Sequence, residues 1–252
     1  MHMILAVIPI LSFQFDECRY SATREATVDA AAASRIYVSA GSGTLRVEGK
    51  PGLRQARLRG TACASDRRLL EEIELTATRS GTEVRVHSND NDKDLRNREY
   101  ARLDLVIEVP ENLATEIDDS SGDIQIYGLG AVHITDGSGE IVADDIRGSL
   151  TIDDGSGEIK VTGVRGDLKI TDGSGEIDAL DIGGIVDIRD GSGQITVSKT
   201  LRDVLISDSS GGIDVDDVGG AFTVRNDGSG GIHHRAVRGT VSLPAKFRRS
   251  WY

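Results

Sequence analysis

The fold is decided by a stretch of sequence that repeats itself. Residues 136–153 read DGSGEIVADDIRGSLTID, residues 154–171 read DGSGEIKVTGVRGDLKIT and residues 172–189 read DGSGEIDALDIGGIVDIR. A period of this length is the signature of repeat units that stack on one another. The opening tetrad, Asp-Gly/Ser-Ser-Gly, recurs at intervals of 17, 18, 18, 18, 18 and 19 residues, beginning at Asp119, Asp136, Asp154, Asp172, Asp190, Asp208 and Asp227.

Each repeat carries the pattern of two short strands. Ile159 and Val161 alternate with polar neighbours, as do Leu168 and Ile170, and this period of two predicts strands with one buried face. The tetrad is turn sequence, because Asp accepts hydrogen bonds from backbone groups two residues on and Gly adopts a positive φ. We therefore predict an all-β chain that forms a single β-solenoid of ~18-residue rungs, stacked ~4.8 Å apart around ladders of Ile, Val and Leu.

A second turn follows the first strand of each repeat. An apolar residue such as Ile146 precedes it and is expected to fill the corner. A left-handed hexapeptide helix is the alternative, since it also has 18 residues per coil, but aliphatic residues here are spaced by 5, 6 and 7 from Ile141 to Ile159. The second turn usually ends in glycine, as at Gly148, Gly166, Gly184, Gly220 and Gly239.

The repeat continues weakly upstream, where residues 36–49 and 105–118 read as further rungs, the latter with Pro110 at a corner. Between them we expect a strand over 57–63, a short helix over 65–75 with Ser65 or Asp66 as N-cap, strands over 75–78 and 83–87, and an exposed charged loop over 89–99. The expected organisation is a leader at 1–17, N-terminal rungs and a capping region at 18–116, regular repeats at 117–244 and a basic tail at 245–252.

Charge is concentrated in the repeats. The chain of 252 residues has a net charge of −12, and residues 117–231 hold 23 acidic against 8 basic side chains. The last 21 residues hold 5 basic and no acidic side chains, and end in AKFRRSWY, which could contact anionic headgroups, cap the acidic array or form a tail. Nucleic acid is not an expected partner, because its phosphates repel an acidic protein. No apolar run reaches the ~20 residues of a transmembrane span.

The N-terminal segment and the cysteines point to export. Residues 4–13 form a ten-residue apolar run that suits the core of a signal peptide, although no Lys or Arg precedes it, and a first strand is the alternative. The chain has two cysteines, Cys18 and Cys63, and an even count in an exported protein predicts a disulfide. Two buried thiols are the alternative. We expect an exported protein of the periplasm or the cell surface of a bacterium.

The acidic columns suggest a metal hypothesis. If the rungs are in register, Asp136, Asp154 and Asp172 lie ~5 Å apart, and like charges at that spacing repel by ~0.8 kcal/mol in water. Glu140, Glu158 and Glu176 form a second column. Calcium would offset the repulsion. In the simpler interpretation, each Asp caps its own turn and the Glu column faces water, so we assign no metal ligand.

Catalytic signatures are absent from the sequence. There is no G-x-S-x-G, H-E-x-x-H or Walker A motif. Paired carboxylates can act on polysaccharides, but equivalent acids on every rung favour a turn role. We therefore expect no enzyme, no catalytic residue and no cofactor. His133, His233 and His234 read as surface residues, and the repeat with Gln194, Lys199, Thr200, Arg202 and Asp203 reads as drift in a tolerant turn or as a binding spot.

The repeated S-G-E/D-I-x-V turns, preceded by the strand IEVP at 107–110, resemble the bacterial "putative adhesin" family of β-strand repeats, which is related to head GIN domains. The resemblance covers residues 36–244 and departs from the family in its weak leader and in lacking a membrane anchor. It implies a cell-envelope β-solenoid with no catalytic residues to carry over. The expected function is a non-enzymatic, adhesin-like module that presents an acidic repeat face to an envelope or surface partner. The alternatives are a calcium-stabilised solenoid and a polysaccharide-acting β-helix enzyme.

Overall fold

The computed structural model describes residues 18–89 and 99–245. Within these ranges the chain is almost entirely β, with two 11-stranded sheets and one short helix, α1 (Arg67–Glu72). The expected leader at 1–17, most of the charged loop at 89–99 and nearly all of the basic tail at 245–252 fall outside the described residues. No helix in the described ranges has the length and apolar character needed to cross a membrane.

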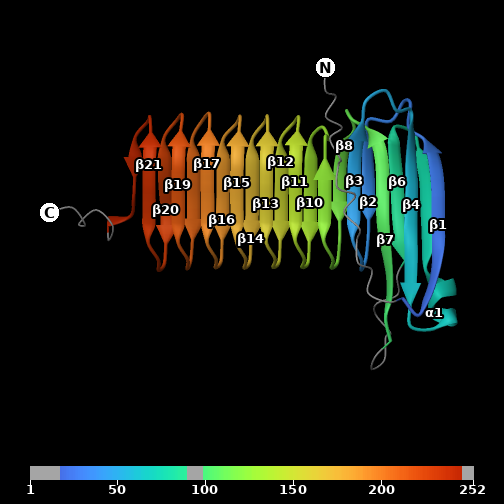
Figure 1. Cartoon of the computed structure of the whole chain (residues 1–252). Coiled ribbons are helices and arrows are strands. Elements are labelled where there is room, and N and C mark those ends of the chain that lie inside the picture. Colours follow the sequence, from blue (N-terminus) through green and yellow to red (C-terminus); the bar gives the residue numbers. More distant parts are fainter. Residues whose placement is uncertain (1–17, 90–98, 246–252) are drawn as a thin grey trace, which may run out of the picture.

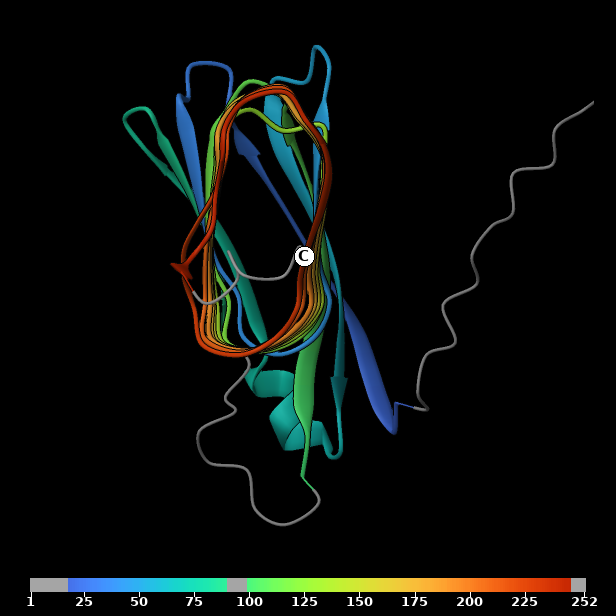
Figure 2. The same cartoon turned by 90° about the vertical axis from the view of Figure 1, so that its left-hand side faces the viewer.

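The two sheets face each other, and each rung gives one strand to each sheet. Viewed along the axis, the rungs superpose as a flattened ring (Figure 2). Sheet A contains, in spatial order, β1 (Tyr20–Asp29), β4 (Gln55–Ala64), β7 (Ala101–Pro110), β3 (Leu45–Lys50), β9 (Ile124–Tyr127), β11 (Ile141–Ile146), β13 (Ile159–Val164), β15 (Ile177–Ile182), β17 (Ile195–Thr200), β19 (Ile213–Val218) and β21 (Ile232–Val237). Sheet B contains β22 (Val241–Ser242), β20 (Phe222–Asp227), β18 (Val204–Asp208), β16 (Val186–Asp190), β14 (Leu168–Asp172), β12 (Leu150–Asp154), β10 (Val132–Asp136), β8 (Ala114–Asp118), β2 (Arg35–Ser39), β6 (Glu83–Asn89) and β5 (Glu74–Ser80).

The predicted solenoid is confirmed, and it is built from paired strands rather than from hexapeptides. From β8 to β21 the strands of successive rungs pair in parallel, and Ile141, Ile159 and Ile177 lie directly above one another. These isoleucines are fully buried, and burying one such side chain contributes about 1.5–3 kcal/mol. The alternating pattern of each repeat therefore becomes an apolar ladder between the two sheets.

The second corner of each rung is filled as the sequence predicts. Ile146, Val164 and Ile182 are buried and aligned in one column. The chain reaches this column through a residue with positive φ, which lets the strand turn inward. These residues are Asp145 (φ 51°), Gly163 (71°), Asp181 (61°), Lys199 (54°) and Asp217 (51°).

The N-terminal region departs from the simple order of rungs. Strands β2 and β3 form a rung that lies between the rung of β6 and β7 and the rung of β8 and β9, so a blue segment sits among green ones in Figure 1. The rungs predicted over 36–49 and 105–118 correspond to β2 with β3 and to β7 with β8, but this insertion was not predicted. Beyond them β1, β4 and β5 pair antiparallel to their neighbours and cover the sheet edges.

The short helix belongs to this cap. Asp66 is its N-cap, and Asp66 Oδ1 accepts a hydrogen bond from Leu69 N at 2.9 Å. The helix ends earlier than predicted, at Glu72, because Ile73 turns into an extended conformation and β5 begins one residue later. Arg24 of β1 donates to the carbonyl oxygens of Leu70 and Ile73 at 2.8 Å each, which joins the helix to the edge of sheet A.

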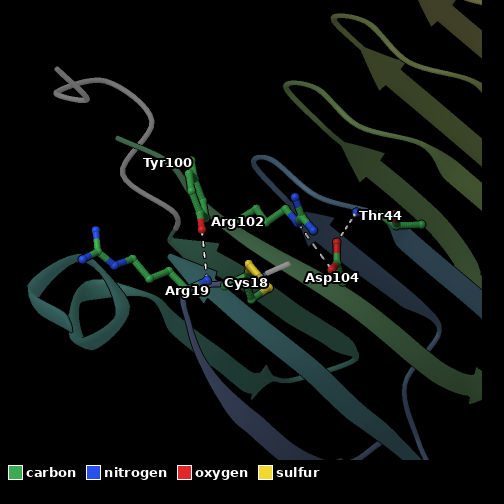
Figure 3. The surroundings of a disulfide bond; sticks show 7 residues. Cys18, Arg19, Thr44, Tyr100, Arg102 and Asp104 are labelled. Atoms are coloured by element: carbon green, nitrogen blue, oxygen red, sulfur yellow. Dashed lines mark hydrogen bonds and ion pairs between the residues drawn. A yellow bond between two sulfur atoms is a disulfide. The ribbon is translucent and has the colours of Figure 1, made fainter. Parts of the chain in front are cut away.

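The expected disulfide is present between Cys18 and Cys63, whose Cα atoms lie 5.5 Å apart (Figure 3). It links the start of β1 to the end of β4. Next to it, the hydroxyl of Tyr100 accepts a hydrogen bond from Arg19 N at 3.1 Å. The disulfide therefore ties β1, the edge strand of sheet A, to its neighbour β4.

Candidate functional site

The aspartates of the repeated turns form one column inside the solenoid. Each lies at an inward position at the end of a strand of sheet B, as Asp154 does after Leu150 and Ile152, or directly after the strand in the case of Asp119. We call the column of these side chains the Asp column, and its members are Asp119, Asp136, Asp154, Asp172, Asp190, Asp208 and Asp227, all between 1% and 8% exposed. From Asp136 to Asp227 they occupy matching register positions in successive strands. The expected alignment is confirmed, but the inward direction of these carboxylates was not predicted.

The Asp column caps the turns, as the simpler interpretation of the sequence predicts. The backbone N–H groups of Ser156, Ser174, Ser192 and Ser210 donate to Oδ1 of Asp154, Asp172, Asp190 and Asp208 at 3.3, 3.2, 3.1 and 2.9 Å. The second carboxylate oxygen, Oδ2, of Asp154, Asp172 and Asp190 is buried and accepts no hydrogen bond. In Asp154, Asp172 and Asp190, one oxygen is thus used by the turn, and the other is left over in the interior.

Burial and proximity alter the acidity of the Asp column. Burial, followed by the neighbouring Asp154, raises the pKa of Asp136 to about 6. Burial, followed by the neighbouring Asp172, raises the pKa of Asp190 to about 6. The pKa values of Asp154 and Asp172 are also raised, mainly by burial. These four carboxyl groups therefore bind a proton more readily than exposed aspartates do.

The Glu column lies outside the same corner and is not continuous. Lys160 Nζ binds Glu140 and Glu158 at 2.8 Å each, and these hydrogen bonds raise the pKa of the ammonium group. Gln194 interrupts the column and donates to Asp214 at 2.9 Å. Among the described residues, no three His, Cys, Asp or Glu side chains converge as a metal site.

The acidic repeat does not become a uniformly acidic face. Seven of the 23 acidic side chains between residues 117 and 231 are buried in the Asp column. Others are paired on the surface, such as Asp187 with Arg225 at 3.1 Å and Asp153 with His133 at 3.1 Å. The net charge of the repeats is therefore largely a consequence of their turns.

The outer face of sheet A carries two adjoining depressions. One has a volume of about 310 Å³ over β13, β15 and β17, and the other has a volume of about 430 Å³ over β17, β19 and β21. Both are lined by Thr196 and Ser198, whose small side chains lie between them. We call the two depressions together the sheet A groove, and its outward polar residues are Lys160, Thr162, Asp178, Thr196, Ser198, Asp214, Asp216, His233 and Arg235.

The sheet A groove has a mixed but net acidic lining. Lys160 is bound by two glutamates, and Arg235 pairs with Asp216 at 2.6 Å. Asp178 and Asp214 add negative charge beside these pairs. Sequence analysis did not identify the groove; the available signal was the run of small outward residues in the one repeat that reads ITVS.

The irregular repeat keeps the architecture of its neighbours. Thr200 occupies the corner column between Ile182 and Val218 and is 2% exposed. Asp203 Oδ1 accepts from Ala221 N at 2.8 Å, as Asp167 does from Ile185 N in an earlier rung. These residues therefore serve the turn, and the depression nearest to them is lined by Thr196 and Ser198 instead.

The three histidines of the sequence analysis, His133, His233 and His234, take different positions. His133 is on the outer face of sheet B, where it contacts Asp153. His233 lines the sheet A groove. His234 aligns with the inward residue Val215, and its ring centroid lies 6.0 Å from that of Phe222. All three histidines are exposed, as the sequence predicts, although His234 also packs against the buried ring of Phe222.

Neither a family model nor a curated protein matches this chain. A solved structure described as a "putative adhesin" from Bacteroides fragilis NCTC 9343 is similar, with 15% identity, a TM-score of 0.55, and coverage of 90% of this chain and 98% of that chain. A "putative lipid binding protein" from Parabacteroides distasonis ATCC 8503 has 18% identity, a TM-score of 0.46, and coverage of 90% and 97%. No comparison bears on the relation to head GIN domains. The chain shares its solenoid fold with the "putative adhesin" structure from Bacteroides fragilis.

Proposed function

We propose that the protein is a non-enzymatic binding module of the bacterial cell envelope that holds an extended glycan in the sheet A groove. The groove itself is the observation that carries this proposal. It crosses five strands from β13 to β21, a length of about 19 Å at the usual strand spacing. Such a shape suits a linear polymer rather than a compact small molecule.

The lining favours recognition by side-chain hydrogen bonds. Hydroxyl groups come from Thr162, Thr196 and Ser198, and acceptors come from Asp178 and Asp214. Strands β15, β17 and β19 are each paired on both sides, so a peptide has no free strand edge to extend there. The net negative charge favours a neutral or amino-sugar-containing glycan over an anionic one.

Two features support a non-enzymatic role outside the cytoplasm. Disulfides persist in oxidising compartments, and the bond between Cys18 and Cys63 fits an exported protein. The acidic residues of the array recur from rung to rung, whereas hydrolysis needs one particular pair of carboxylates. Similarity of fold to a structure described as an adhesin is consistent with binding as the main activity.

Calorimetric titration with oligomers of N-acetylglucosamine, and with their deacetylated cationic counterparts, tests the proposal. A Ser198→Trp variant fills the point at which the two depressions join, and we expect its affinity to fall at least ~10-fold. Thr171→Trp, on the outer face of sheet B, is the matched control and should bind as the unmodified protein does. Equal binding by both variants, or no binding of neutral or cationic glycans by the unmodified protein, would contradict the proposal.

A further inference from the structure

We propose that the Asp column is a proton-binding site. Neighbouring carboxyl groups share protons along the column, so the folded array takes up protons as the pH falls and is more stable at mildly acidic than at neutral pH. The inference is independent of glycan binding. It is based on the register of the column, on its burial and on the second carboxylate oxygens of Asp154, Asp172 and Asp190.

The geometry makes a fully ionised column costly. Parallel strands lie ~4.8 Å apart, and Asp136, Asp154, Asp172 and Asp190 occupy successive strands in register. They are between 5% and 8% exposed, so water screens their repulsion poorly. Two carboxylates that share a confined site cannot both ionise freely, and the affinity of one of them for a proton rises.

A bound proton also provides a hydrogen-bond donor for a buried carboxylate oxygen that has none. Oδ2 of Asp154, Asp172 and Asp190 is buried without a donor. A protonated carboxyl group becomes an O–H donor, so it can bond to an oxygen of the next rung while Oδ1 keeps its bond to the turn. The same proton therefore removes one charge and satisfies one buried acceptor.

The charged neighbours described for Asp136, Asp172 and Asp190 add negative charge and do not offset that of the column. The charged groups that act on it are acidic: Asp123 and Asp154 on Asp136, Asp154 on Asp172, and Asp172 and Asp208 on Asp190. Across the interior, the inward positions of β13, β15 and β17 hold Ile, Val and Ala, with Thr200 at the corner. The raised pKa values, about 6 for Asp136 and Asp190, agree with proton sharing.

The sign of the pH dependence follows from linkage. An unfolded Asp has a pKa of about 3.9, so the folded column binds protons that the unfolded chain releases between pH ~4 and ~6. The free energy of unfolding therefore rises as the pH falls from 7 through 6 towards 4. Below that range the gain ends, and carboxylates with lowered pKa values, such as Glu48 and Glu83, lose their ion pairs.

Melting temperatures measured from pH 7.5 to pH 5.0 test the inference. We expect the unmodified protein to gain about 5–10 °C over this range. The triple variant Asp154→Asn, Asp172→Asn and Asp190→Asn keeps an oxygen for each turn and gains an N–H₂ donor, so its melting temperature should be much less dependent on pH. The control carries Asp178→Asn, Asp181→Asn and Asp214→Asn, which remove the same charge outside the column, and should keep the gain.

A direct readout separates protons from cations. In carbon-13 NMR, the carboxyl signals of Asp136 and Asp190 should titrate near pH 6 in the unmodified protein, and the signal of Asp190 should be absent from the triple variant. If the triple variant does not fold, Asp190→Asn alone should remove that signal. A melting temperature that is flat or falls on acidification overturns the inference. So does a rise at pH 7.5 with calcium that chelator reverses and the column variants abolish, because the column would then hold cations.

Discussion

The regular array from β8 to β21 and the N-terminal region from β1 to β7, which contains the cap, are held together in different ways. In the array, each residue pairs with a residue one repeat further on, and every strand pairing is parallel. In the cap, antiparallel strands, a helix and a disulfide join segments in an order unlike their order in the sequence. An 18-residue unit is therefore enough to specify the array, whereas the end of the solenoid depends on contacts between distant residues.

The difference arises because the array and the cap satisfy the backbone hydrogen-bonding groups of their strands in different ways. A rung inside the array is covered by identical neighbours on both sides, so repeating one sequence satisfies every backbone group. The last rung at the N-terminal end would expose two strand edges, and repeat proteins need different sequences there. Strands β4 and β5 cover the edges of β7 and β6, and β1 extends sheet A beyond β4. Arg79 of β5 forms an ion pair with Asp29 of β1 at 2.5 Å. The cap thus joins the two sheets that the array keeps apart.

The largest expected effect on stability comes from substituting a turn glycine, because the space around such glycines differs most between the array and the cap. Gly175 in the array has a φ of 151°, and a Cβ there would lie 1.6 Å from the carbonyl oxygen of Gly157. Gly175→Ala must push two rungs apart, and we expect it to lower the free energy of unfolding by more than about 4 kcal/mol. Urea unfolding followed by circular dichroism measures the loss.

Gly81 in the cap is the matched control. It also has a positive φ, 60°, but a Cβ there meets nothing within 4 Å. Gly81→Ala should cost only the backbone term of about 1–2 kcal/mol. Similar losses for Gly175→Ala and Gly81→Ala would mean that close stacking does not constrain the array.

The disulfide provides an intermediate effect that should remain within the cap. Cys18→Ala removes the bond and leaves Cys63 as a buried thiol, which packs as a small apolar side chain. Loss of a disulfide typically costs about 2–4 kcal/mol. Hydrogen exchange should therefore speed up in β1 and β4, with little change in β15 and β17. Equal acceleration in the array would show that the two regions unfold as one unit.

The sequence predicted the array almost completely, because its information is local. The alternation of Ile159 and Val161 identified a strand, and the Asp-Gly-Ser-Gly tetrads identified the turns and their capping hydrogen bonds. The N-cap at Asp66 was also predictable from residue type. Each of these features depends on residues within a few positions of one another, which is the range over which a sequence pattern carries information.

The features that were missed all depend on neighbours distant in the chain. The rung of β2 and β3 is inserted between two later rungs, and no local pattern records that order. The inward direction of Asp154 follows from counting two residues beyond Ile152, a step that the polar character of Asp discouraged. Lys160 bridges glutamates of two rungs, and the sheet A groove depends on small residues aligned across several strands.

The smallest effect concerns the one corner at which the array departs from its own pattern. Thr200 is 2% exposed and lies between Ile182 and Val218, and its hydroxyl has only a long 3.5 Å bond to the carbonyl of Arg202. Thr200→Val restores the apolar column without changing shape, and we expect a gain of about 0.5–1 kcal/mol in urea unfolding. Thr196→Val, facing outward on the same strand, should change stability by less than about 0.5 kcal/mol. A loss on Thr200→Val would mean that the hydroxyl holds the corner, and that this rung is specified by its own hydrogen bond rather than by the ladder.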